Sequence, residues 1–148
     1  MLTVNLEDLP LKESWTDATL SQRARSTFPL LGAAANKTTS AVYFELEPGH
    51  ELGLHTDSAE ELLFVIEGRV DVTVGAERVT VAAPGLAVVP AMVRHNLTNV
   101  GRAAAKVIGF FPSRYLVATF DNVWQPDGTN VVDTAKIEEM LATQGARV

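Results

Sequence analysis

Residues 49–99 read GHELGLHTDSAEELLFVIEGRVDVTVGAERVTVAAPGLAVVPAMVRHNLTN, and they carry the clearest strand pattern and the candidate ligands of the chain. Near its start, the segment Leu52–Asp57 predicts a strand. Side chains of a strand alternate with period two, so His55 and Asp57 point to the same face. Two side chains of types that bind metal ions, His55 and Asp57, are therefore expected on one face of this strand.

The next parts of the stretch add a carboxylate and a second imidazole. The run Glu61–Ile66 predicts a mostly buried strand whose first residue is charged, and a buried carboxylate needs a partner. His95 begins another strand after a turn led by Pro90. Two imidazoles and one or two carboxylates are thus brought together as candidate ligands.

These residues resemble the first motif of the cupin superfamily. That motif is Gly, five residues, His, one residue, His, three or four residues, Glu, six residues, Gly. It is matched here by Gly49, His55, Asp57, Glu61 and Gly68, with Asp57 in place of the second His.

The second cupin motif is Gly, five residues, Pro, one residue, Gly, two residues, His, three residues, Asn. Pro90, His95 and Asn99 match it, while Pro84 and Met92 stand where the family has Gly. The resemblance implies an all-β fold, the double-stranded β-helix or jelly-roll barrel, similar to the quercetin-dioxygenase-like cupins. It also implies dioxygenase chemistry on a small aromatic or diketone-like molecule, with isomerase or decarboxylase chemistry as alternatives.

The ligand types indicate one divalent ion per chain. Two neutral imidazoles and a carboxylate suit Fe, Mn, Ni or Zn and leave positions open for water, substrate or dioxygen. The predicted metal ligands are His55, Asp57, Glu61 and His95, with Glu61 on the strand beside His55. Asp57 could complete the ligand set, or it could orient His95 or a bound water.

Two other functions fit the same residues. A non-catalytic cupin could hold a small ligand as a sensor or storage protein, and the Asp57 substitution favours this alternative. A 2-oxoglutarate-dependent oxygenase would use His55, Asp57 and His95 as its ligands and Arg102 to hold the co-substrate carboxylate. The short chain and the spacing of Glu61 weigh against that third hypothesis.

The whole chain has the composition of a globular protein. Its 148 residues suit a single cupin domain over 1–148. The formal charge of −6 argues against nucleic acid or an acidic membrane as partner, and the absence of cysteine excludes thiolate sites. The N-terminus has no basic, apolar leader, so we expect a cytoplasmic protein. Its expected partner is a small-molecule ligand or substrate.

Further strands are predicted around the motif core 49–99. They are Ala41–Glu47, Val70–Val74, Arg78–Val81, Ala104–Phe111 and Tyr115–Phe120. In the first of these, Val42, Phe44 and Leu46 are expected to face the core, with Tyr43 and Glu45 on the polar face.

The two ends of the chain are expected to pack on this barrel. The N-terminal arm 1–38 contains a polar run, Ser21–Ser26, that indicates a short exposed helix or a loop. The C-terminal extension 112–148 closes with a short amphipathic helix that Asp133 caps and Gly145 can end. Ile137, Met140 and Leu141 form its apolar face.

Smaller expectations concern single positions. His50 is interpreted as a solvated loop residue, and Asn99 as a side chain that hydrogen-bonds backbone at a strand end. Met92 in place of the family's Gly indicates either a different turn type or a left-handed backbone, which would cost Met about 1 kcal/mol. Phe120, like the other aromatic residues near it, is interpreted as core.

The strand that Glu61 begins also predicts the assembly. Leu62, Phe64 and Ile66 lie on the face opposite Leu63 and Val65, so both faces are apolar and the outer one needs cover. We expect a homodimer, although the N-terminal arm could supply the cover instead.

Overall fold

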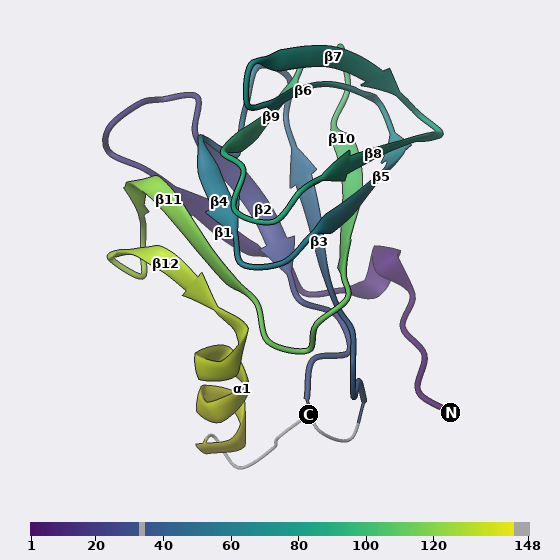
Figure 1. Cartoon of the computed structure of the whole chain (residues 1–148), viewed down its shortest axis with the longest axis vertical. Coiled ribbons are helices and arrows are strands. Elements are labelled where there is room, and N and C mark those ends of the chain that lie inside the picture. The colour runs from purple at the N-terminus through teal and green to yellow at the C-terminus, as the bar shows by residue number, and fades with distance from the viewer. Residues whose placement is uncertain (33–34, 144–148) are drawn as a thin grey trace.

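Figure 1 shows the computed structural model, which describes residues 1–32 and 35–143, as two β-sheets facing each other. In order across the sheet, the first consists of β1 (Lys12–Trp15), β2 (Arg23–Thr27), β3 (Ser40–Leu46), β10 (Ala105–Phe111), β5 (Glu61–Glu67) and β8 (Gly85–Val89). The second consists of β12 (Thr129–Asp133), β11 (Val117–Trp124), β4 (His55–Asp57), β9 (His95–Asn99), β6 (Arg69–Val74) and β7 (Glu77–Ala82). All paired strands are antiparallel, which confirms the predicted all-β jelly-roll barrel.

The core lies between the sheets and is built from the inward positions of both. Its fully buried apolar side chains include Phe44, Leu46, Leu63, Val65, Val70, Leu97 and Val107. The alternation predicted for β3 is confirmed for Phe44 and Leu46. Tyr43 lies on the other face, as predicted, because it pairs with Ile108 of β10. It is nevertheless buried there, and its hydroxyl donates to Oε2 of Glu45 at 2.6 Å.

The N-terminal arm contributes strands that its sequence did not indicate. The run Ser21–Ser26 was expected as a helix or loop, but most of it lies in β2, so this prediction is wrong. Its charges explain the difference, because Arg25 pairs across the sheet with Glu45 and reaches Glu47 as well. Upstream, the arm holds β1 and a short 3-10 helix, η1 (Leu6–Asp8).

The C-terminal helix α1 (Thr134–Thr143) begins where it was predicted. Oδ1 of Asp133 accepts a hydrogen bond from the backbone N–H of Ala135 at 3.0 Å, which confirms Asp133 as the N-cap. The expected packing of its apolar face is wrong for Met140 and Leu141, whose side chains are exposed. Gly145 lies outside the described residues. No helix among those residues is long and apolar enough to cross a membrane.

The turn before β9 fixes where that strand starts. Of the two alternatives for Met92, the structure has the left-handed backbone, with φ of 63°. The N–H of Met92 donates to the carbonyl of Asp57 at 2.8 Å. At the other end of β9, the Asn99 amide donates to the carbonyls of Leu46 and Ala103. This confirms the backbone role of Asn99, and both ends of the strand are held.

Candidate metal centre

Three of the predicted ligands come from neighbouring strands of one sheet. His55 and Asp57 lie on β4, and His95 lies on β9 directly opposite His55 in the antiparallel register. Residues two apart on a strand share a face, so His55 and Asp57 both point to the barrel interior. The centroids of the two imidazole rings are 4.0 Å apart.

The fourth predicted ligand reaches the same point from the opposite sheet. Glu61 opens β5, which lies between β10 and β8 and not beside β4, so the expectation that its strand neighbours His55 is wrong. Its Oε1 nevertheless lies 3.4 Å from Nε2 of His95. The cluster therefore joins the two sheets across the core.

The closest approach is between Asp57 and His95. Oδ2 of Asp57 lies 3.0 Å from Nε2 of His95, and one ligand atom from each of His55, Asp57 and His95 falls within 4.8 Å of the others. This geometry places Asp57 beside the imidazoles as a candidate ligand in its own right, with Glu61 next to them.

The same atoms are buried and unsatisfied. None of the four side chains is more than 5% exposed, and neither Oδ2 of Asp57 nor Nε2 of His95 has a hydrogen-bond partner of acceptable geometry. Buried polar groups are normally paired, so these two atoms need an explanation. A cation between them would satisfy both, so the residues present fit a divalent metal ion.

Both imidazoles are oriented by main-chain carbonyls. Nδ1 of His55 donates to the carbonyl of Gly53 at 2.7 Å, and Nδ1 of His95 donates to that of Val93 at 2.9 Å. Because a carbonyl oxygen only accepts, Nδ1 carries the proton in each ring. In the neutral ring, Nε2 is then left with a free lone pair, which is the form that binds metals.

The burial and the crowding of charge shift the acidities in this cluster. Burial and the neighbouring His95 lower the pKa of His55 to about 4, and burial raises the pKa of Glu61 to about 7. Burial alone would lower the pKa of His95, but the carboxylates of Asp57 and Glu61 outweigh it and raise that pKa to about 10. In neutral His95, the lone pair of Nε2 faces the carboxylate oxygens of Asp57 and Glu61 at 3.0 and 3.4 Å, and either a proton or a metal ion between these atoms would relieve their repulsion.

Two residues that the sequence analysis did not assign to the site contribute to its shape, and one of them, Phe120, is also the core residue that was predicted. Phe120 stacks on His55 with ring centroids 4.3 Å apart, and Trp124 lies edge-on to Phe120 at 5.4 Å. Gly109 leaves room for Glu61, because a Cβ at position 109 would lie 2.1 Å from Oε2 of Glu61. The signal for Phe120 was its inward position on an alternating strand. For Gly109 the sequence held no signal.

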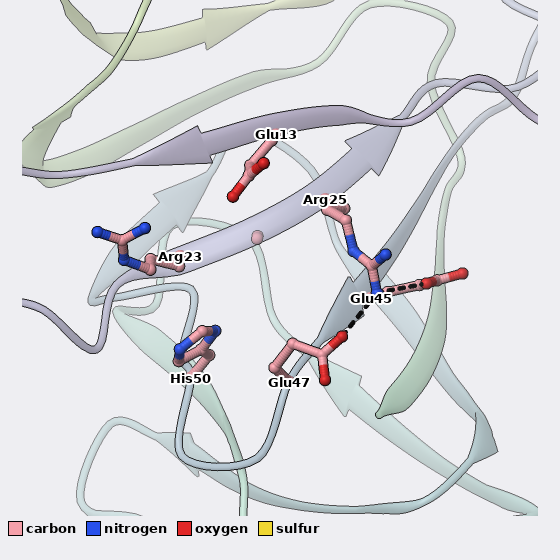
Figure 2. Close-up of a pocket in the computed structure, with 7 residues that line it drawn as sticks. Glu13, Arg23, Arg25, Glu45, Glu47 and His50 are labelled. Atoms are coloured by element: carbon pink, nitrogen blue, oxygen red, sulfur yellow. Dashed lines mark hydrogen bonds and ion pairs between the residues drawn. The ribbon is translucent and has the colours of Figure 1, made fainter. Parts of the chain in front are cut away.

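The other two candidates lie away from the cluster. His50 is half-buried beside a groove of about 80 Å³ on β1–β3, where Figure 2 shows Arg25 between Glu45 and Glu47. That volume is far below the roughly 300 Å³ of a small-ligand pocket. Arg102 is exposed in the bend after β9, whereas His95 starts this strand, so the predicted co-substrate residue lies at the opposite end from the ligands.

Comparisons with known proteins agree with this fold. A family model described as Cupin domain matches residues 42–111. No curated protein matches the chain. Similar solved structures include a recombinant oxalate oxidase in complex with glycolate, at 21% identity and a TM-score of 0.60 over 70% of this chain and 57% of that one.

Two further solved structures are similar to this chain at comparable TM-scores. The formate complex of Lactobacillus farciminis oxalate decarboxylase is 19% identical, with a TM-score of 0.65 over 78% of this chain and 34% of that one. The cupin domain of Schizosaccharomyces pombe Cnp3 is 16% identical, with a TM-score of 0.62 over 76% of this chain and 74% of that one. The chain spans little more than half of the oxidase and a third of the decarboxylase, and these similarities concern the fold.

Proposed function

Because this chain belongs to the cupin superfamily, and because four buried ligand side chains meet inside its barrel, we propose that it binds one divalent metal ion and acts as a metal-dependent oxidoreductase on a small organic molecule. The ligands are His55, Asp57, Glu61 and His95. The observation that carries the proposal is the pair of unpartnered buried atoms, Oδ2 of Asp57 and Nε2 of His95, 3.0 Å apart.

The donor set selects the class of ion. Imidazole nitrogen with carboxylate oxygen suits Fe, Mn, Ni or Zn, and four protein ligands leave room in an octahedral shell. When bound, such an ion supplies a Lewis acid or a binding position for dioxygen. The chain's own residues hold both imidazoles by Nδ1, exclude water by burial and present the face of Phe120 against His55.

We propose two substrate classes. The first is small carboxylates, and the second is small aromatic or diketone-like molecules. The oxalate oxidase and oxalate decarboxylase that share the fold support the first class. The aromatic ring of Phe120, which stacks on His55 with Trp124 edge-on to it, supports the second, because aromatic rings pack favourably against one another. The reaction class that follows is dioxygenase or oxidase chemistry.

A second function, a non-catalytic sensor or storage cupin, is favoured by one observation. His95 is completely buried and His55, Asp57 and Glu61 nearly so, which leaves the four ligands closed to solvent. A site that only holds a metal-anchored ligand does not need the repeated access that turnover requires.

Metal content tests the binding half of the proposal. Protein purified without added metal or chelating resin should carry about one divalent ion per chain, measured by elemental mass spectrometry. His55→Gln and His95→Gln should remove it. The third histidine provides a matched control, because His50 lies outside the cluster and His50→Gln should leave the metal content unchanged. Equal metal content in all three variants would contradict the site.

Dioxygen consumption then separates the enzyme from the sensor. Protein loaded with Fe(II) or Mn(II) should consume dioxygen when given one of a panel of small carboxylates, aromatic molecules and diketones, and His55→Gln should not. Compounds that bind to the loaded protein, seen by calorimetry, without any dioxygen uptake or loss of substrate would favour the sensor.

A further inference from the structure

The outer surface of the first sheet carries a continuous apolar face where β10, β5 and β8 lie side by side (Figure 1). The apolar face consists of Leu62, Phe64, Leu86, Val88, Ile108 and Phe110. Leu62 lies directly between Val88 and Phe110 in the register, and Phe64 lies between Leu86 and Ile108. The six side chains thus form two adjacent cross-strand rows.

This face is open to solvent in the described part of the chain. Leu62, Leu86, Val88 and Phe110 are between 40% and 63% exposed. The N-terminal arm was the other candidate to cover it, but Met1, Leu2 and Val4 are themselves exposed. An apolar strand face at the outside of a sheet is costly to leave in water.

We propose that the apolar face binds the same face of a second copy of this chain, so that the protein is a homodimer with a twofold axis through β5. A twofold interface brings the same patch together from both copies, so the patch must be self-complementary. The apolar face meets this condition because it contains no charged side chain. Ion pairs such as that between Lys106 and Glu67 lie at its border, which matches a polar rim around an apolar centre.

Charge also favours this surface as the contact between two copies. Each chain carries a formal charge of −6, so two copies repel each other wherever acidic residues meet. The apolar face allows close approach without burying a like-charge pair.

The area fits a stable dimer. A fully exposed side chain of this size offers about 150–200 Å², so the four most exposed residues, at 40–63% exposure, present about 300–400 Å² of apolar surface. An interface of standard size buries about 800 Å² on each partner, a little over half of it apolar, or about 450 Å². The four residues supply most of that amount, and the half-buried Phe64 and Ile108 add to it. Sheets that pack face to face lie about 10 Å apart.

Molar mass in solution tests the proposal. At tens of micromolar, light scattering should give twice the 15.9 kDa of one chain. Val88→Glu should give one chain, because it would bury a carboxylate against its copy. Val123→Glu is the matched control, since Val123 is 45% exposed on β11 of the other sheet, and it should stay dimeric. A monomeric wild type, or a Val88→Glu dimer as tight as the control, overturns the proposal.

A second measurement covers the case in which Val88→Glu does not fold. The chain has no cysteine, so a single introduced thiol reports on one position. Alkylation of Val88→Cys should slow as the protein concentration rises, whereas alkylation of Val123→Cys should not. Equal, concentration-independent rates at both positions would show that the apolar face remains uncovered and would rule out the interface.

Discussion

His95 is the residue whose surroundings differ most from those of an ordinary side chain. It is fully buried, two carboxylates lie within 3.4 Å of its Nε2, and its pKa is raised to about 10. A metal ion must displace the proton that this environment holds. Metal binding and proton release are therefore coupled at this residue.

The coupling predicts how metal affinity varies with pH. Only deprotonated His95 binds metal, and the deprotonated fraction grows tenfold per pH unit up to about 10, so the association constant should rise about tenfold per unit between pH 7.5 and 9. Below about pH 7 the protonation of Glu61 makes the dependence steeper. His55 adds nothing in this range, because its pKa lies at about 4.

Competitive chelation over that pH range measures the slope. Calorimetry in buffers of different ionisation enthalpy counts the protons, and about one should be released at pH 8. An affinity that is flat from pH 7.5 to 9 would say that His95 does not ligate.

The two carboxylates can be compared by isosteric changes. Asp57→Asn should weaken metal binding at least tenfold, because the buried Oδ2 of Asp57 lies 3.0 Å from Nε2 of His95 and accepts no hydrogen bond from another group. Glu61→Gln, 3.4 Å from the same nitrogen, should weaken it by no more than Asp57→Asn does.

Metal affinity by competitive chelation decides the order, with circular dichroism to show that both variants are folded. A cupin in which Asp57 only orients other ligands would show the reverse order. Unchanged affinity in both variants would exclude the metal site and leave the metal-free binding protein.

The spacing of residues in the sequence predicted which of the four ligand side chains meet, but not the distances between them. Alternation alone placed His55 with Asp57, and motif spacing added Glu61 and His95. The contact between Asp57 and His95 depends on the direct pairing of β4 with β9, in which His55 lies opposite His95, 40 residues further along the chain. The stacking of Phe120 on His55 depends in the same way on the pairing of β11 with β4.

Among the strands, β10 has a special part because its Gly109 lies against Glu61. Gly109→Ala should lower both stability and metal affinity, since the added Cβ would overlap Oε2 of Glu61 and the carboxylate must move. Overpacking of this kind costs about 1–3 kcal/mol of unfolding free energy. Thermal and denaturant unfolding measure this loss.

A double-mutant cycle provides the control for that prediction. In the Glu61→Ala background the obstructing carboxylate is gone, so Gly109→Ala should cost clearly less there than in the wild type. Equal costs in both backgrounds would show that the backbone at position 109, and not the contact with Glu61, is responsible.

Strands with regular alternation were predictable, and strands made by cross-strand charge were not. β3, β5, β6 and β10 all lie within a residue or two of their predicted bounds. β2 was not predicted because its sequence is polar and lacks an apolar alternation. Its Arg25 is stabilised in the strand by ion pairs with Glu45 and with Glu47, which the sequence of β2 alone does not reveal. β12 carried no clear pattern before its pairing with β11 was known.

For the whole molecule, the site is a link between the two sheets, since β4 and β9 belong to one and β5 to the other. Metal that binds only the folded state stabilises it, by about 4 kcal/mol when free metal is a thousandfold above its Kd. Removal by a chelator should therefore lower Tm by about 10 °C in a chain of this size.

Scanning calorimetry of metal-loaded and chelated protein measures this shift. His50→Gln should show the same shift as wild type, and His55→Gln should show none. If the chelator leaves Tm unchanged in wild type, the four side chains do not hold a metal ion.

The hydrogen bonds that orient the two imidazoles have an evolutionary consequence. Both acceptors are main-chain carbonyls two positions upstream, at Gly53 and Val93, and a mutation of a side chain cannot delete a carbonyl. Lineages are thus free to vary position 93 while the ring of His95 keeps its orientation. Gly53 lacks that freedom for a different reason, since its φ is +86° and a side chain there would collide with Gln22. In a saturation library selected for folded, metal-binding protein, many residues should be accepted at position 93 and almost none except Gly at position 53.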